Sequence, residues 1–393
     1  MEHFITEVKI DELRHLSNIV ITLNPEKRQH LMITGKNGSG KTSLLLALQQ
    51  YLQAINDGKM ADLHESDEEL LKIQETFESV FTNLKQYKNG VEPRFNEWKD
   101  LDALYAQGNF VTAFFPADRK TQIIRAQGVE DIKLSNTYDI QSNPGTLLHK
   151  YMVHLKTQQA YARNEGDMAT VDRIQKWFNR FVDALRILLD DDSVTLEYDY
   201  KEYDFRIHEN GRLPFGFDQL SDGYSSVINI VSDLILRMDK NWLLSDRLSE
   251  YNVEGIVLID ELETHLHIEL QKKIMPFLTT FFPRIQFIVT THSPYILNSI
   301  ANAKAYDLEN CVELENLSLY SSDGLAQGYF GADEYADELK QKIEQYQYLV
   351  EKSELTEEER AQRARLRSEL KNIPRGLSQE ARDKFEEIEE KRL

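Results

Sequence analysis

One short segment near the start of the chain restricts its fold more than any other feature. Residues 35–42 read Gly-Lys-Asn-Gly-Ser-Gly-Lys-Thr, follow an apolar run at 31–34 and lead into helix-forming residues at 44–50. A strand, a glycine-rich loop and a helix in this order, with the G-x-x-x-x-G-K-S/T pattern, are typical of a phosphate-binding loop. Glycines let the backbone approach phosphates, and the helix N-terminus offers free N–H groups. We therefore expect a nucleotide to bind here.

The loop predicts ATP as the nucleotide and Mg²⁺ as its companion ion. Lys41 would neutralise phosphate charge, and the Thr42 hydroxyl would reach the Mg²⁺. The residues that we expect to contact the nucleotide are Gly35, Lys36, Asn37, Gly38, Ser39, Gly40, Lys41, Thr42 and Ser43.

A pair of carboxylates further along the chain fits the same chemistry. Residues 255–259 have the pattern of a buried strand, and Asp260 and Glu261 follow it directly. In phosphate-loop folds this position lies beside the γ-phosphate. We expect Asp260 to hold the Mg²⁺ shell and Glu261 to orient or deprotonate the attacking water.

Two more segments complete the set of candidate site residues. Ser221 and Gly223 precede an apolar helical stretch at 227–236, so they would lie at a helix N-terminus that favours anions. Ser-Asp-Gly is also an ordinary turn and helix cap, so this signal is weak alone. A buried-strand pattern at 284–291 precedes His292, which is placed to sense a γ-phosphate.

The order of these motifs resembles the ABC-type ATPase superfamily, in the branch with the SMC, RecF and overcoming-lysogenisation-defect (OLD) ATPases. The resemblance covers residues 1–50 and about 210–310. It implies that Ser221 and Gly223 contact the γ-phosphate held by a second subunit, so that ATP lies between two heads. It also implies that His292 is the switch histidine, catalytic together with Glu261 and Lys41.

The run at 260–267, Asp-Glu-Leu-Glu-Thr-His-Leu-His, looks like an element of the OLD-like branch. That branch includes bacterial antiphage ATPases such as those of the Septu and PARIS systems. One departure is Asp222, where transporters carry Gly. Another is the turn after the strand at 110–115, which lacks a clear Q-loop glutamine. Gln122, Asp118 and Arg119 are the candidates to replace it.

These features predict an α/β fold with an ABC-type ATPase head, made of a mixed β-sheet and flanking helices. Residues 1–50 and 195–330 would form the head, and residues 51–194 a largely helical insertion with one core strand near 110–115. Within it, we expect residues 43–108 to be largely helical with a break at Pro93, and we expect short strands at 213–217 and 317–320.

Residues 331–393 would form a charged, helical extension for assembly or partner docking. We expect its apolar residues to pack as a helical hairpin that must dock on something, because so small a core cannot stand alone. The surface could be the chain's own head or a partner. These residues are Ile343, Tyr346, Leu349, Val350, Leu355, Leu366, Leu370 and Ile373.

Charge and cysteine content restrict partners and compartment. The 393-residue chain has a formal net charge of −20, which disfavours a broad nucleic-acid surface but permits a local basic groove. Candidates are Arg119, Lys120, Arg125 and Lys133, and an arginine cluster at 360–367. No apolar run is long enough for a membrane helix. A single cysteine and an N-terminus unlike a signal peptide predict a cytoplasmic protein.

Two further clusters have simpler explanations. Glu263, His265 and His267 have a feasible spacing for a metal site, but Zn²⁺ needs three or four converging ligands. The acidic run at 190–192 resembles a nuclease cluster, yet it lies at an expected helix-to-strand turn.

Three classes of function therefore remain. We favour a homo-oligomeric ATPase that scaffolds or gates a separate effector, a nuclease or toxin, in antiphage defence, with a nucleic acid or a phage protein as trigger. The alternative is a RecF-like or SMC-like ATPase in DNA repair or DNA-end sensing. A transporter motor fits least, because the Q-loop is irregular and the insertion and tail are unlike a coupling subunit.

Overall fold

The computed structural model divides the chain into two compact units, Met1–Leu319 and Tyr320–Leu393. It describes residues 2–69, 84, 86–119, 123–244, 253–315, 317–329, 337–352, 354–372 and 379–392. Within these residues, no helix is both long enough and apolar enough to span a bilayer.

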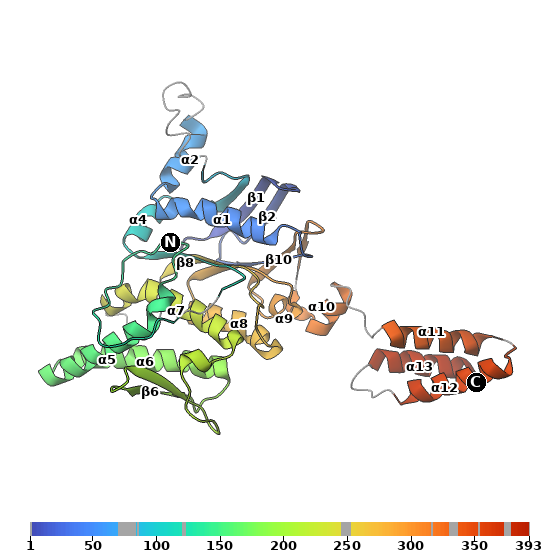
Figure 1. The fold of residues 1–393 in the computed structure, drawn as a ribbon. Coiled ribbons are helices and arrows are strands. Elements are labelled where there is room, and N and C mark those ends of the chain that lie inside the picture. Colours follow the sequence, from blue (N-terminus) through green and yellow to red (C-terminus); the bar gives the residue numbers. More distant parts are fainter. Residues whose placement is uncertain are drawn as a thin grey trace. The chain divides into compact units, whose positions relative to one another are not determined.

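A six-stranded mixed sheet forms the centre of the first unit, with the strand order β11-β10-β3-β9-β8-β5 (Figure 1). Strands β10, β3, β9, β8 and β5 run parallel, and β11 pairs antiparallel with β10. Strands β8 and β9 are buried along their whole length, as their largely apolar sequences predict. The bounds are β3 (His30–Thr34), β5 (Phe110–Phe115), β8 (Glu254–Ile259), β9 (Ile285–Thr290), β10 (Ala303–Asp307) and β11 (Val312–Leu314).

A second, antiparallel sheet has the order β2-β1-β4 and contains β1 (Ile5–Leu13), β2 (Leu16–Thr22) and β4 (Val91–Phe95). Strand β4 corrects the prediction of a helical segment broken at Pro93. Here Pro93 pairs with Val8 of β1. Strand β4 lies at the edge of this sheet. Proline is tolerated there, because no further strand needs the backbone N–H that proline lacks.

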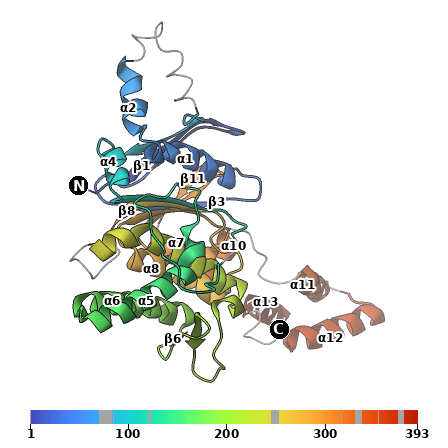
Figure 2. The ribbon, with the colours of Figure 1, turned by 60° about the vertical axis from the view of Figure 1, so that its left-hand side comes forward.

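Helices cover the central sheet on both sides (Figures 1 and 2). Helix α1 and the antiparallel sheet lie on one side, where Leu48 and Leu52 share a core with Ile256 and Ile288. Helices α7 and α8 lie on the other side, with α5 and α6 farther out. The elements are α1 (Lys41–Asn56), α2 (Met60–Glu69), α4 (Leu101–Ala106), η2 (Pro144–Leu147), α5 (Leu148–Glu165), α6 (Met168–Leu189), α7 (Asp222–Leu244), α8 (Ile268–Phe281) and α9 (Pro294–Leu297).

Two expected strands, at 213–217 and 317–320, differ in the structure. A hairpin of β6 (Thr195–Asp199) and β7 (Asp204–His208) is present as predicted, but residues 213–217 contribute only a single bridge between Ile207 and Phe215. The segment 317–320 forms the 3₁₀-turn η4 (Leu317–Leu319), and another 3₁₀-turn, η3 (Phe217–Gln219), precedes α7. Alternating sequences this short also suit a 3₁₀-turn, so pattern alone did not separate the two.

Helix α7 contains an acid in the interior of the protein. The Asp239 side chain is fully buried, and burial raises its pKa from 3.8 to about 7, against the opposing effect of the Tyr151 hydroxyl and the Trp177 indole. Between these two pH values the folded chain keeps a proton that the unfolded chain has released. The free energy of unfolding therefore falls as the pH rises through this window, and it levels off above about pH 7.

We expect Asp239→Asn to remove this pH dependence, because the amide stays neutral. The variant should gain stability relative to the wild type between pH 5 and pH 8 by about 1 kcal/mol or more, since one pKa unit corresponds to about 1.4 kcal/mol. Urea unfolding at both pH values measures the difference. Asp172→Asn, on the exposed side of α6, is the control for the loss of one charge. An equal gain at both pH values would contradict the assignment.

Among the described residues of the second unit, the helices α11, α12 and α13 cover one another. Helix α11 packs on both α12 and α13, and the shared core includes Tyr346, Leu370 and Phe385. Thr356 and Glu359 form a capping box at the start of α12. The expected hairpin therefore has a third helix, and its apolar residues need no external surface. Ile373 lies outside the described residues. The helices are α10 (Ser322–Gly328), α11 (Asp337–Glu351), α12 (Glu357–Lys371) and α13 (Gln379–Arg392).

Candidate functional site

Apart from Ser221 and Gly223, the predicted site residues follow neighbouring strands of the central sheet. Strands β3, β9, β8 and β5 are adjacent and parallel, so the segments after them meet at one edge. Open α/β sheets bind ligands at this carboxyl edge. The phosphate loop follows β3, His292 follows β9, Asp260 and Glu261 follow β8, and Arg119 follows β5.

The phosphate loop has the backbone that an anion cradle requires. Gly35, Gly38 and Gly40 all have positive φ. At Gly35, with φ +130, a Cβ atom would lie 2.8 Å from the Ser39 hydroxyl and 3.1 Å from an Asp307 carboxylate oxygen. Helix α1 begins next to Gly40 without a side-chain cap and without an acidic residue in its first turn. Its first N–H groups therefore remain open to a phosphate.

Lys41 lies over this loop and faces the acidic turn. Its ammonium donates to the carbonyl oxygens of Gly35, at 2.8 Å, and Lys36, at 3.0 Å. Burial lowers the pKa of Lys41, while the carboxylates of Glu261, Glu263 and Asp260 raise it. The buried Ser39 hydroxyl has no hydrogen-bond partner among the described residues. The Lys41 ammonium can bind the negative charge of a phosphate group, and the Ser39 hydroxyl can donate a hydrogen bond to it.

The first turn of α1 provides the hydroxyl that was predicted to reach a Mg²⁺. Thr42 is exposed there, and Ser43 is half-buried beside it. Asp260, the other predicted ligand, is 3% exposed at the end of β8. A hydroxyl and a carboxylate are oxygen ligands of the kind that Mg²⁺ prefers, so the donor set fits this ion.

The turn after β8, residues 260–262, is named the catalytic turn after the role expected of Glu261, and it is ordered by a residue that sequence reasoning missed. The Thr290 hydroxyl, at the end of β9, donates to an Asp260 carboxylate oxygen at 2.6 Å and accepts the Glu261 N–H at 2.7 Å. Glu261 itself has φ +44, in the left-handed region that few non-glycine residues adopt. The Thr264 hydroxyl donates to its carboxylate at 3.2 Å. A hydroxyl at the end of a largely apolar strand was the available signal.

His292 is held against the same turn by Glu263. The His292 backbone N–H donates to one Glu263 carboxylate oxygen at 2.5 Å. The other oxygen and the His292 Nε2 atom are buried and have no partner among the described residues. Burial, followed by the charge of Lys41, lowers the pKa of His292. The imidazole is therefore neutral at pH 7 and can hydrogen-bond a phosphate oxygen or a water.

This contact gives Glu263 a role other than that of a metal ligand. His265 and His267 are exposed. Within the part of the chain that the structure describes, no three His, Cys, Asp or Glu side chains are grouped to hold a metal ion.

Gly223 lies against the loop that follows the catalytic turn. A Cβ atom at Gly223 would be 2.5 Å from the carbonyl oxygen of His265, so a larger residue would push the two segments apart. Ser221 is exposed just before α7. The structure thus brings Gly223 to the turn after β8 but leaves Ser221 facing solvent.

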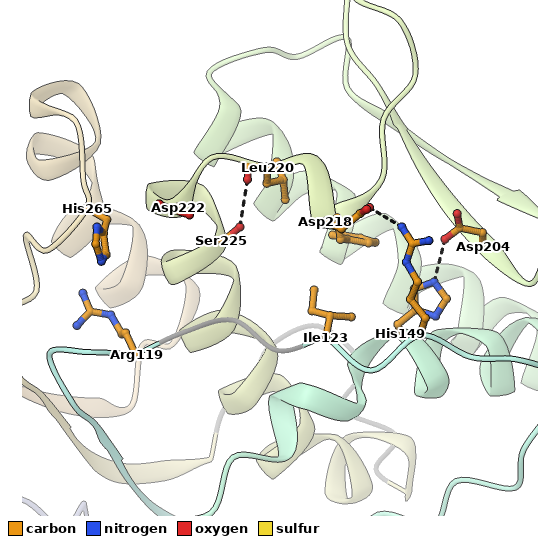
Figure 3. A pocket seen from close by; sticks show the side chains of 11 residues that line it. Arg119, Ile123, His149, Asp204, Asp218, Leu220, Asp222, Ser225 and His265 are labelled. Carbon is orange, nitrogen blue, oxygen red and sulfur yellow. Dashed lines mark hydrogen bonds and ion pairs between the residues drawn. The ribbon is translucent and has the colours of Figure 1, made fainter.

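Residues 220–226, named the signature segment because the resemblance gives Ser221 and Gly223 that role, and the phosphate loop line two different cavities. One, of about 560 Å³, is lined by loop residues including Lys36 and Ser39, by His15 of the β1–β2 turn, by Leu16 at the start of β2, and by Glu309. The other, of about 630 Å³, is lined by residues of the signature segment and contains none of the phosphate loop (Figure 3). Its lining residues include Arg119, Arg125, His149, Asp204, Asp218, Leu220, Asp222, Ser225 and His265. The β1–β2 turn has no motif that would have placed it beside the phosphate loop.

Arg119 occupies the position where a Q-loop residue was expected. It is 6% exposed and donates to backbone carbonyls of the catalytic turn. Asp118 is exposed, and Gln122 lies outside the described residues.

Three members of the first predicted basic groove, at 119–133, are buried or paired with an acid. Because Arg119 is buried, it cannot belong to a basic groove. Arg125 pairs with Asp218 at 2.5 Å and Lys133 with Asp131 at 3.5 Å, and Lys120 lies outside the described residues.

Some members of the other two clusters are also paired. In the second unit, Arg365 pairs with Glu369 at 3.1 Å. In the acidic run at 190–192, Asp190 pairs with Lys273 at 2.6 Å, which agrees with a solvated turn.

The fold and site define an α/β protein with the phosphate loop of P-loop ATPases. A family model described as "AAA domain, putative AbiEii toxin, Type IV TA system" matches residues 156–298. That range contains the signature segment, the catalytic turn and His292.

Individual relatives lead to the same group. A Septu protein PtuA of Bacillus mycoides (strain KBAB4) is 24% identical over 403 residues, with 96% of this chain and 51% of the relative covered. A Septu protein PtuA of Bacillus thuringiensis is 24% identical over 310 residues, with 76% and 74% covered. The Retron Vc95 probable ATPase of Vibrio cholerae serotype O1 biovar El Tor is 25% identical over 352 residues, with 69% and 67% covered.

The chain spans about half the length of the first Septu relative. It is related to the Septu PtuA proteins and to retron ATPases, and the resemblance to Septu-type ATPases that the motifs predicted is confirmed.

Proposed function

We propose that this chain is an ABC-type ATPase head that binds and hydrolyses ATP between two copies of itself. The observation that carries the proposal is the convergence of Lys41, Glu261 and His292 at one edge of the sheet, after three adjacent parallel strands. The buried ammonium, the carboxylate held in an unusual backbone conformation and the neutral imidazole are the groups that phosphoryl transfer to water requires.

Each group has a distinct part in this proposal. The loop N–H groups and Lys41 bind the β- and γ-phosphates, and Glu261 accepts a proton from the attacking water. His292, held by Glu263, donates to the γ-phosphate. A Mg²⁺ held by Thr42 and Asp260 would neutralise charge on the phosphate oxygens. The cavity beside His15 and Leu16 is large enough for the base and ribose.

Lys41→Ala tests the binding site. The variant should bind ATP about 10- to 100-fold more weakly, because hydrogen bonds to charged groups contribute about 1.5–3 kcal/mol and each 1.4 kcal/mol is tenfold in affinity. Titration with a fluorescent ATP analogue measures this, together with release of inorganic phosphate. Lys59→Ala, an exposed lysine beyond the other end of α1, is the control for lost charge. Equal affinities of all three proteins would rule out the proposed phosphate site.

We further propose that the ATPase gates a separate effector, a nuclease or toxin, in antiphage defence. The Septu and retron names of its relatives support this role. Phage plating on cells that express the chain with its neighbouring genes tests it. The wild type should reduce plaque formation and Lys41→Ala should not, and equal plaque counts with and without the genes would contradict the role.

A further inference from the structure

Arg119 joins three segments that the sequence keeps far apart. Its Nη1 donates to the carbonyl oxygen of Asp260 at 2.8 Å, and its Nη2 donates to those of Glu261 at 3.2 Å and Leu262 at 3.0 Å. Its Nε donates to the Ser226 hydroxyl on α7 at 2.7 Å. One guanidinium therefore binds three consecutive carbonyls of the catalytic turn and the first turns of the signature helix.

Because the Arg119 side chain is buried, water cannot easily replace the groups that it binds. Arg119 is 6% exposed, and burial lowers its pKa to about 10, while the charges of Glu263, Asp260 and Glu261 raise it. The guanidinium still carries its charge at neutral pH. A buried charge is costly unless its donors are used, so moving the catalytic turn without Arg119 would leave donors unpaired.

The same two segments meet at a second point. Gly223 of α7 lies against the His265 carbonyl oxygen, where a Cβ would be only 2.5 Å away. In Figure 3, Arg119 and His265 lie at the same end of the cavity, beside the start of α7. Two contacts thus fix the orientation of the signature helix relative to the turn that carries Glu261.

We propose that Arg119 is a positioning residue that couples the start of the signature helix to the backbone of Glu261, so that ATP contact at the signature segment sets the carboxylate for hydrolysis. This inference rests on the proposed ATPase function. The guanidinium holds the Glu261 carbonyl from one side while Thr290 holds its N–H from the other, and together they keep the residue at φ +44. In this proposal Arg119 acts through Glu261, because its donors are used by the turn carbonyls and by Ser226.

Arg119→Lys is the main test, because lysine keeps the charge but cannot bind several carbonyls at once. We expect kcat to fall about 10- to 100-fold while KM for ATP changes less than about twofold, since the phosphate loop is intact and only the chemical step is affected. Ser226→Ala removes only the link to α7 and should lower kcat about three- to tenfold.

Arg237→Lys is the matched control. Arg237 is also buried, lies on α7 and donates to backbone carbonyls, including that of Thr112 at 3.0 Å. Within the described residues, its hydrogen bonds go to α7 and to residues 112–142 and not to the catalytic turn. It should lower the melting temperature without separating kcat from KM.

Chemical rescue gives a readout that loss of packing would not produce. Guanidinium at about 10 mM, far below denaturing concentrations, should raise the turnover of Arg119→Ala but not of Arg237→Ala. Unchanged kcat in both Arg119→Lys and Ser226→Ala would overturn this inference alone, and so would an equal kcat loss in Arg237→Lys. If Arg119→Lys does not fold, the kcat of Ser226→Ala alone tests the inference, and an unchanged kcat overturns it. Absence of ATP turnover by the wild type would overturn the proposed function as well.

Discussion

Glu261→Gln should bind ATP as tightly as the wild type and hydrolyse it at least about 100-fold more slowly, since a positioned general base contributes about 10²- to 10⁴-fold. The amide has the size of the carboxylate and can still accept the Thr264 hydroxyl, which lies 3.2 Å from the carboxylate in the wild type. It cannot accept a proton from water. Single-turnover hydrolysis and equilibrium binding of ATP separate the two effects.

Glu269→Gln provides the control for this loss of one carboxylate. Glu269 lies on the exposed first turn of α8 and pairs with Lys272. Its variant should hydrolyse ATP at the wild-type rate. If two heads enclose ATP, Glu261→Gln should also accumulate as an ATP-bound dimer, which light scattering detects. Wild-type hydrolysis by Glu261→Gln would remove Glu261 from the role of base.

The parts of the site that were predictable are those where chemistry follows a strand directly. The phosphate loop, Asp260 with Glu261, and His292 each come after an apolar run, and parallel strands bring their carboxyl ends to one edge. The sequence therefore shows both the type of each residue and its place at the carboxyl end of a strand. Such a prediction does not require knowing which distant segment packs nearby.

The parts that were not predictable depend on pairing between distant segments. Strand β4 exists because Val91 and Pro93 pair with β1, more than eighty residues earlier. Thr290 and Arg119 act on backbone N–H and carbonyl groups, which every residue has, so no motif identifies the partners. His15 lies beside the phosphate loop only because β1 and β2 turn there.

The second unit shows the same limit in a different way. The apolar spacing of α11 and α12 was readable, and the inference that their surface must be covered was sound. Its cover is α13, where Ala381, Phe385 and Ile388 complete the core. The argument that this hairpin must dock on the chain's own head or on a partner is therefore wrong, and partner docking by this unit stays a prediction without that support.

Ser221→Arg tests whether each ATP site is shared between two chains. Ser221 is exposed before α7, and the signature segment and the phosphate loop line different cavities. An arginine there should leave the fold and the affinity for ATP within about twofold, because surface substitutions usually change stability by less than about 0.5 kcal/mol. It should abolish hydrolysis, because the large side chain would hold the second head away from the γ-phosphate.

Mixing two inactive variants gives the decisive measurement. In a mixed dimer of Ser221→Arg and Glu261→Gln, one site has both defects and the other has an intact Glu261 from one chain and an intact Ser221 from its partner. Random assortment in a twofold dimer should therefore restore about one quarter of the wild-type rate, since half the dimers are mixed and each has one working site of two. If Ser221 served its own subunit's ATP, every chain would have a defective site and mixing would restore nothing. Loss of ATP binding by Ser221→Arg alone would likewise place this segment in its own subunit's pocket.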